Sequence, residues 1–238
     1  MIPRRTFLAI TGGTLLAPRF LWAATEVPMI LDHILLGCSD LDQGIAYVQQ
    51  HIGVRPAIGG VHPGRGTRNA LLSLGEMRYL EVIAPDPAQA GQKVSRESMV
   101  NTLKTLKTPQ IFEWAVHTTH IENVAQSWER EGIAFDGPTP GSRKRPDGRV
   151  LNWQTLNLQD NRNGLLPFFI QWGTNSVHPS VDAPQGSRLK NFFLAGPDLG
   201  ALAGICHRIG IQVELQKADE PKLLAEVVGP GGTLHLGS

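Results

Sequence analysis

The amino-acid sequence predicts an α+β fold built from repeated strand–helix–strand–strand–strand modules. The first observation is a repeated order of local signals: an apolar strand, a polar turn, an amphipathic helix and a closing glycine occur at residues 30–53, 110–132 and 188–210. The second is their regular spacing, because equivalent helix starts lie 80 and 78 residues apart. The third is composition: 41% of the 238 residues are hydrophobic and 18% are charged, as in an ordinary globular protein.

The first module is expected to cover residues 29–87. Its helix follows a turn at Ser39 and Asp40, carries apolar residues at steps of three or four, and ends at Gly53, where a left-handed cap is expected. Short apolar runs then predict three strands, near Val54–Ile58, Asn69–Leu74 and Arg78–Ala84.

A linker at 88–109 precedes the second module. It opens with proline and glycine and predicts a helix at Ser95–Leu106, capped by its serine. The second module is expected over residues 110–175, with a flexible loop of proline, glycine and basic residues at 137–149. Its later strands are expected near Val150–Leu158 and Leu166–Trp172.

A shortened third module is expected over residues 188–238. Its helix closes at Gly210. The strand-like runs after the helix are compressed and lie at Gln212–Lys217, Leu223–Val228 and Gly232–Leu236.

Charge, hydropathy and motifs exclude several classes of function. The sequence has 22 lysines and arginines against 21 aspartates and glutamates, so its net charge of +1 provides no basic field for nucleic acid. No uninterrupted apolar run reaches the roughly 18 residues of a membrane span, so we expect none in the mature protein. Nucleotide-binding glycine loops, HExxH and GxSxG are absent from the sequence. Cys38 and Cys206 are expected to be separately buried thiols, because two cysteines are too few for a disulfide scaffold.

Residues 1–24 are interpreted as an export signal. Arg4 and Arg5 precede a short apolar run that ends in small residues at Ala23 and Ala24, which resembles a bacterial twin-arginine signal peptide. This pattern predicts a periplasmic mature protein that crosses the membrane folded. The alternative is a cytosolic amphipathic helix at the N-terminus.

Several motifs together indicate a superfamily. LDHILLGCSDLDQGIAYV opens the first module and GEMRYLEVIAPDP closes it, while HPGRGTRNALLSLG lies between them and LPFFIQW follows in the second module. This order resembles the glyoxalase/bleomycin-resistance/extradiol-dioxygenase (vicinal oxygen chelate) superfamily, and more narrowly its glyoxalase-like domain family, over most of residues 29–179. The resemblance implies curved, mainly antiparallel sheets in which two paired modules enclose a cupped site.

The resemblance also implies metal ligands on the first and last strands of each module. In the first module these positions hold His33 and Glu81, and strand alternation is expected to place His33 on the face of Leu31 and opposite Asp32. Imidazole and carboxylate are suitable ligands for zinc, nickel, iron, manganese or cobalt. The structural alternative is a hydrogen-bonded core histidine and a paired strand carboxylate.

The second module departs from the family pattern. Its matching positions hold Glu113 and Gln171. Gln171 is expected as a ligand, although an amide oxygen is a weaker donor than a carboxylate. Glu113 is expected either to bind the metal or to act as the base that moves a proton, since burial in an apolar cup raises the pKa of a carboxyl group.

Two loops supply candidate substrate-binding residues. The glycine-rich segment GGVHPGRGTRN carries His62, Thr67 and Asn69, whose side chains can exchange hydrogen bonds with a ligand. The basic segment SRKRPDGR carries Arg149, which can serve as part of a lid over an anionic substrate. The structural alternatives are a plain connection between strands and a solvated mobile loop.

Two functions compete on these residues. One is an exported enzyme, a lyase, isomerase or dioxygenase that uses a divalent metal to act on a small oxygenated substrate. The other is a non-catalytic protein of the bleomycin-resistance type that sequesters a small molecule in the same cup. A small-molecule ligand is the only partner that either interpretation needs.

The paired arginines generate a test of export. Replacing Arg4 and Arg5 by lysine is expected to block export and leave folding in the cytoplasm intact, because the twin-arginine route requires both guanidinium groups. Cell fractionation of the tagged chain measures the result. Unchanged accumulation in the periplasm would contradict the assignment.

Overall fold

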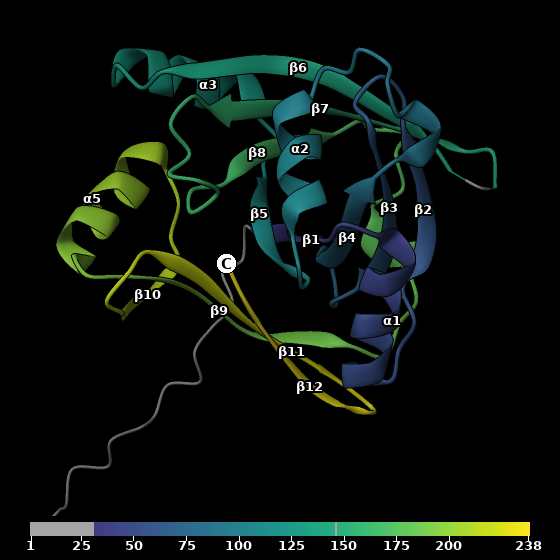
Figure 1. Ribbon diagram of the computed structural model, residues 1–238. Coiled ribbons are helices and arrows are strands. Elements are labelled where there is room, and N and C mark those ends of the chain that lie inside the picture. Colours follow the sequence, from purple (N-terminus) through teal and green to yellow (C-terminus); the bar gives the residue numbers. More distant parts are fainter. Residues whose placement is uncertain (1–30, 146) are drawn as a thin grey trace, which may run out of the picture.

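The computed structural model describes residues 31–145 and 147–238 (Figure 1). The elements up to the linker are β1 (Leu31–Gly37), α1 (Leu41–Ile52), β2 (Ala57–His62), β3 (Thr67–Ser73), β4 (Tyr79–Pro85), the 3-10 helix η1 (Pro87–Gln89) and α2 (Glu97–Thr105). The next are β5 (Gln110–His117), α3 (Ile121–Arg130), β6 (Phe135–Lys144), β7 (Val150–Leu158), β8 (Phe168–Trp172) and α4 (Pro179–Asp182). The last are β9 (Arg188–Gly196), α5 (Leu199–Ile209), β10 (Glu214–Lys217), β11 (Lys222–Gly229) and β12 (Gly232–Gly237). The predicted signal segment lies outside the described residues.

Eight strands from the two larger modules form one curled sheet in the order β2-β3-β4-β1-β5-β8-β7-β6. The first and last strands of each module pair in parallel, β1 with β4 and β5 with β8, while every other pair in the sheet is antiparallel. The antiparallel pair β1–β5 joins the modules, so their concave faces form one surface. This arrangement is the vicinal oxygen chelate fold and confirms the predicted fold class.

The helix of the first module begins and ends at residues that suit its termini. The Asp40 side chain caps α1 by accepting a hydrogen bond from the Gln43 backbone, and Gly53 closes the helix with φ 76°. Ile45 and Val48 of this helix are fully buried. A glycine at position 53 therefore meets a backbone requirement that most other residues satisfy only with strain.

The loop predicted at 137–149 is largely a strand, which corrects the expectation of a flexible segment. β6 includes residues 137–144 and pairs with β7 from Phe135 to Lys144, with one register shift between Asp136 and Thr139. β6 is an edge strand, where prolines are tolerated because one row of backbone groups needs no partner. The proline and glycine content therefore indicated an edge and a bulge.

The convex face of the curled sheet carries the main hydrophobic core. α1 and α3 pack there together with a second sheet, in the order β10-β9-β11-β12 (Figure 1). Trp114 of β5 packs against Phe192 of β9 at a ring distance of 4.8 Å, and Trp128 of α3 donates a hydrogen bond from its indole nitrogen to the Ile209 carbonyl. These contacts fix the C-terminal segment against the second module, and contacts of α1 with β11 and β12 fix it against the first.

Residues 188–238 follow the order strand, helix and three strands, yet their pairing differs from that of the larger modules. The first strand, β9, is parallel to the second, β10, and antiparallel to the third, β11. In the larger modules the first strand instead pairs in parallel with the fourth. The C-terminal segment thus forms a separate four-stranded sheet that covers the core and does not extend the cup.

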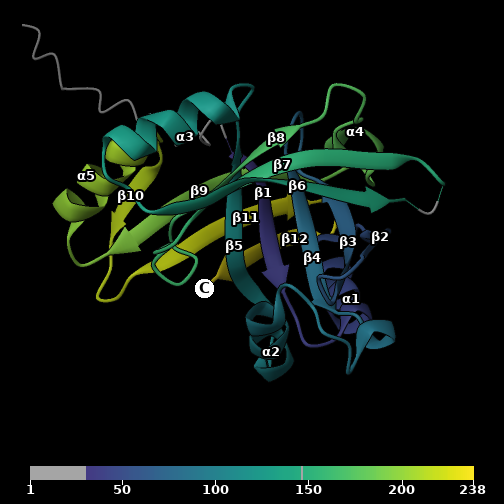
Figure 2. The ribbon, with the colours of Figure 1, turned by 90° about the horizontal axis from the view of Figure 1, so that it is seen from above.

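Two short structures close opposite ends of the concave face (Figure 2). At one end α2 places Leu103 against Leu35 and Ile83, which point into the cup. At the other end the segment around α4 places Ala183 in a cluster with Leu71, Tyr79 and Trp172. The cavity between α2 and the segment around α4 is the candidate functional site.

Two further sequence expectations concern cysteines and membranes. Cys38 and Cys206 are both buried and free. Burial raises the pKa of the Cys38 thiol to about 12 and that of Cys206 to about 11. Among the described helices, none combines the length and the apolar character needed to cross a membrane.

The aromatic contact between the two sheets predicts a strong effect on stability. Replacing Phe192, which is 1% exposed, by alanine is expected to lower the free energy of unfolding by about 3–5 kcal/mol, because the lost ring leaves a cavity beside Trp114. Urea unfolding followed by circular dichroism measures the change. Val181→Ala, at a residue that is 65% exposed, serves as control. A loss below about 1 kcal/mol for Phe192→Ala would show that the second sheet does not depend on this contact.

Candidate functional site

A β-bulge at the start of β1 places an acid–histidine pair at the floor of the cup. Leu31 pairs with Val116 and His33 pairs with the adjacent Ala115, so Asp32 is the extra residue of β1. His33 therefore points into the cavity as predicted, whereas Leu31 turns to the convex core and Asp32 contacts His33. The expected alternation is wrong here, because a bulge shifts by one residue the positions whose side chains point into the cavity.

Asp32 is fully buried and holds three donors. Its oxygens lie 2.6 Å from His33 Nδ1, 2.9 Å from Trp172 Nε1 and 3.2 Å from His178 Nε2. Burial alone would raise the pKa of Asp32, but the hydrogen bonds from His178 and His33 and their charges hold it well below its usual range. An ionised Asp32 accepts a hydrogen bond from His33 Nδ1–H, which orients the ring so that Nε2 faces the cavity and Glu81.

Glu81 of β4 faces His33 across the floor of the cup. Its Oε2 lies 3.5 Å from His33 Nε2, which places the two side chains on the same face of the sheet. Its Oε1 accepts a hydrogen bond of 2.6 Å from Asn69 Nδ2. Asn69 Oδ1 in turn accepts a hydrogen bond of 2.5 Å from Arg143 Nη1. Burial opposes ionisation of Glu81, yet the neighbouring charges of His62, His33 and Arg143 hold the pKa of Glu81 below its ordinary value.

The chain from Glu81 to Arg143 depends on the curl of the sheet. Arg143 lies on β6 and Asn69 on β3, near opposite edges of the eight strands, and the edge strands β2 and β6 come into contact. Gly59 of β2 leaves room for this approach, because a Cβ atom there would lie 2.5 Å from both Arg143 Nη1 and Asn69 Oδ1. The glycines of the predicted substrate loop thus allow strand edges to meet.

His62 and Thr67, both predicted as substrate-binding residues of a loop, are buried in the wall beside Glu81. His62 Nδ1 lies 2.9 Å from Thr67 Oγ1, and His62 Nε2 lies 3.8 Å from Glu81 Oε1. Burial lowers the pKa of His62 to about 4, although the nearby Glu81 charge favours the protonated form. His62 is therefore a neutral hydrogen-bonding group at neutral pH.

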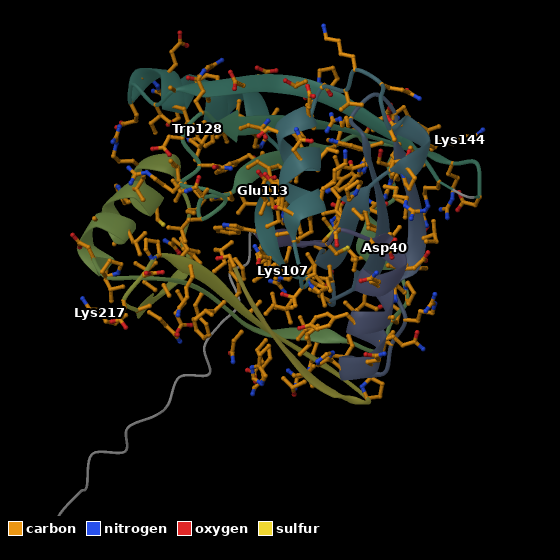
Figure 3. The ribbon with its side chains drawn as sticks, viewed as in Figure 1. Asp40, Lys107, Glu113, Trp128, Lys144 and Lys217 are labelled. Atoms are coloured by element: carbon orange, nitrogen blue, oxygen red, sulfur yellow. The ribbon has the colours of Figure 1, made fainter. Side chains whose placement is uncertain are left out.

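Glu113 lines the cavity from the second module (Figure 3). It lies opposite Leu35 in the β1–β5 pair and accepts a 3.3 Å hydrogen bond from Asn161 Nδ2. Burial raises the pKa of Glu113, against the opposing charges of Arg96 and His33. Glu113 thus lies in the cavity with a raised pKa, and its role in catalysis stays a prediction.

Gln171 and Arg149 lie elsewhere, which corrects their expected positions in the site. Gln171 Oε1 accepts a hydrogen bond from the backbone N–H of Ile121, at the start of α3, so it faces the convex side. Because side chains alternate between the two faces of a strand, Ile170 lines the cavity where Gln171 was expected. Arg149 is half exposed and pairs with Asp147 and Asp182 outside the cavity.

Aromatic side chains form much of the cavity wall. The cavity has a volume of about 80 Å³. Its aromatic residues are Tyr79, Trp153, Phe168 and Trp172. The Tyr79 ring stacks on the His33 imidazole at 4.5 Å, which restrains the ring that carries Nε2.

The donor set does not fit the metal centre expected from the superfamily. His33 Nε2 and Glu81 Oε2 are close enough to share an ion, but the second module places Ile170, rather than Gln171, toward them. Within the described ranges no group of three or more histidine, cysteine, aspartate or glutamate side chains is arranged to hold a metal. The chemistry below is therefore derived from the protein side chains.

Comparison with known proteins agrees with this fold. The glyoxalase-like domain family matches residues 31–210. The chain belongs to the glyoxalase-like domain family. No curated protein matches it significantly.

Several solved structures are similar to this glyoxalase-like chain at low sequence identity. A hypothetical protein from Staphylococcus aureus is similar with a TM-score of 0.60 and 16% identity, over 87% of this chain and 84% of that one. Methylmalonyl-CoA epimerase from Mycobacterium tuberculosis is similar with a TM-score of 0.41 and 18% identity, over 63% of this chain and 90% of that one. The epimerase from Streptomyces coelicolor, in complex with 2-nitronate-propionyl-CoA, has a TM-score of 0.45 and 17% identity, over 63% of this chain and 99% of that one.

Sequence reasoning missed three polar residues of this glyoxalase-like site. Asp32 precedes the candidate ligand His33, and only the bulge turns both toward one network. Arg143 was assigned to a mobile loop, although its strand pairing with Leu151 directs it inward. His178 lies between the second and third predicted modules, outside all three. The signal that would have found Asp32 is its place inside a buried apolar strand, where an ionisable group needs partners.

The buried His62 predicts acid sensitivity. Its folded-state pKa of about 4 lies below the ordinary 6.5, so between these values the unfolded chain binds a proton that the folded chain does not. The free energy of unfolding should fall as the pH drops from about 6.5 to 4, by at most roughly 3 kcal/mol from this residue.

Chemical denaturation at pH 7 and pH 4.5 measures this loss in the native chain and in His62→Gln. Glu81 also loses its favourable charge in acid, so the difference between the two proteins isolates the contribution of His62. Equal acid sensitivity in both would contradict the assignment of a neutral buried imidazole.

Proposed function

We propose that this glyoxalase-like protein is an enzyme of the isomerase or lyase type that moves a proton on a small oxygenated molecule. The observation that carries the proposal is the Asp32–His33–Glu81 row at the floor of a closed-ended cavity. The imidazole is held through Nδ1, so Nε2 is the atom that can take a proton from a bound substrate. The ring that takes this proton lies between the carboxylates of Asp32 and Glu81, with Nδ1 2.6 Å from Asp32 and Nε2 3.5 Å from Glu81.

Glu113 provides the complementary group from the second module. The raised pKa of its carboxyl group suits a residue that holds a proton and returns it to the substrate. His33 and Glu113 extend from neighbouring strands into one cavity, so a substrate between them could lose a proton to one and receive it from the other. Carbon acids next to a carbonyl group are the substrates that such a pair of groups can activate.

Periplasmic localisation and assistance by a metal ion are two further expectations for this protein. Arg4 and Arg5 support export, with the test given above. His33 and Glu81 support at most two ligands of a divalent ion, so we propose proton transfer by the side chains as the central step.

The test is hydrogen–deuterium exchange. The mature protein is incubated in D2O with a panel of 2-oxo and 2-hydroxy carboxylic acids and simple ketones, and NMR follows the loss of each α-proton. At least one compound should exchange faster with the protein. His33→Ala is expected to slow this exchange by about a hundredfold or more, and Asp32→Asn should also slow it, since the Nδ1 hydrogen bond is weakened. His207→Ala, on the exposed side of α5, is the matched control.

Three outcomes would contradict the proposal. Exchange that persists in His33→Ala removes this residue from the mechanism. Binding without exchange supports the sequestering protein. Exchange that is lost in a chelator and restored by zinc, nickel, iron, manganese or cobalt supports the metal-assisted enzyme.

A further inference from the structure

Three arginines from distant parts of the sequence line the same cavity. Arg65 lies in the turn between β2 and β3, Arg96 stands at the N-cap of α2, and Arg143 lies on β6. Arg143 is 3% exposed, while Arg65 and Arg96 are half-buried. Guanidinium groups remain charged at physiological pH, so the fold gathers three positive charges at one small site.

These charges lack direct ionic partners within the described part of the chain. None of the ion pairs among described residues includes Arg65, Arg96 or Arg143. By contrast, Arg145 and Arg149, on the outer turn, both pair with aspartates. The cavity therefore differs from the neighbouring surface in that no carboxylate contacts its arginines directly, although the Glu81 charge lies near Arg65 and Arg143.

Arg143 is the most deeply buried of the three arginines. Its Nη1 donates to the neutral amide oxygen of Asn69, and its Nε is buried without a hydrogen-bond partner. Burying an unpaired guanidinium is costly, and an unused donor adds to that cost. A carboxylate in the cavity would offset the cost of the unpaired charge, because the planar guanidinium group matches the two oxygens of a carboxylate.

The surrounding wall defines the rest of the ligand. The Arg65 guanidinium lies 5.9 Å from the centre of the Trp153 ring, and Trp153 is in turn 5.7 Å from Trp172. A flat apolar group can pack against these indole rings while its charged end contacts the arginines. The carboxyl groups of Glu81 and Glu113 lie in the same cavity and disfavour a ligand that carries negative charge at every end.

We infer that the cup selects a small monocarboxylate with a flat apolar part, and that Arg143 and Arg65 hold its carboxylate. The inference deepens the proposed function, on which it rests, by naming the substrate class. It assigns Arg143 and Arg65 the role of specificity-determining residues, while His33 and Glu113 keep the proton-transfer role.

Isothermal titration with phenylpyruvate and with its neutral methyl ester tests the inference. The acid is expected to bind at least tenfold more tightly than the ester. Arg65→Gln should remove most of this preference, and Arg143→Gln should remove it further. Arg149→Gln, outside the cavity, is the matched control and should retain the preference. Because Arg143 is buried, circular dichroism checks each variant, and the half-buried Arg65 and Arg96 provide variants that do not disturb the strand edges.

Any of three results would overturn the inference. The acid and the ester bind equally well, or the acid does not bind at all. Alternatively, Arg65→Gln and Arg96→Gln both keep the preference of the native protein for the acid. Its failure is distinguishable from that of the proposed function. Proton exchange on neutral ketones without a preference for acids refutes the arginine assignment alone. A tenfold preference without any exchange refutes the enzyme and leaves a carboxylate-binding protein.

Discussion

The buried carboxylate of Asp32 is the constraint on which the site depends. A negative charge with no exposure to water requires compensation, and here three donors from three segments supply it: His33 on β1, Trp172 on β8 and His178 before α4. The same contacts orient the His33 imidazole, join the two modules and anchor the segment that closes one end of the cup. Stability and chemistry therefore rest on one cluster, so a change at Asp32 would disturb both.

The curl of the sheet is the second determinant, because it brings together residues that lie far apart along the strand order. Asn69 bridges Glu81 of its own module and Arg143 of the other, so the floor of the cup is held from both sides. The pair β1–β5 makes this possible by joining the modules edge to edge in one sheet. The small residues of β2 then allow its edge to approach β6.

The concave and convex faces of the sheet have different tasks. The convex face buries large apolar groups such as Trp114 and Phe192 beneath the second sheet, which stabilises the fold without contributing to the cavity. The concave face buries ionisable groups, and each carries a hydrogen-bonding partner, an unusual pKa or an unpaired donor. Such groups are costly to bury, so their concentration in one cavity favours a role in binding and proton transfer.

The sequence by itself determined the α+β class and the repeated order of elements, and it identified His33, Glu81 and Glu113 as residues of one cup. The class and the order of elements follow from periodicity and turns, which are local signals, and the three site residues follow from the resemblance of the motifs to the family. Only the tertiary structure decided that Asp32 faces His33, that Gln171 points to α3, and that Arg143 rather than Arg149 reaches the cavity. The physical reason is that a side chain on a strand changes face with a shift of one residue, and the bulges and edge contacts that set the register are made between segments distant in the chain.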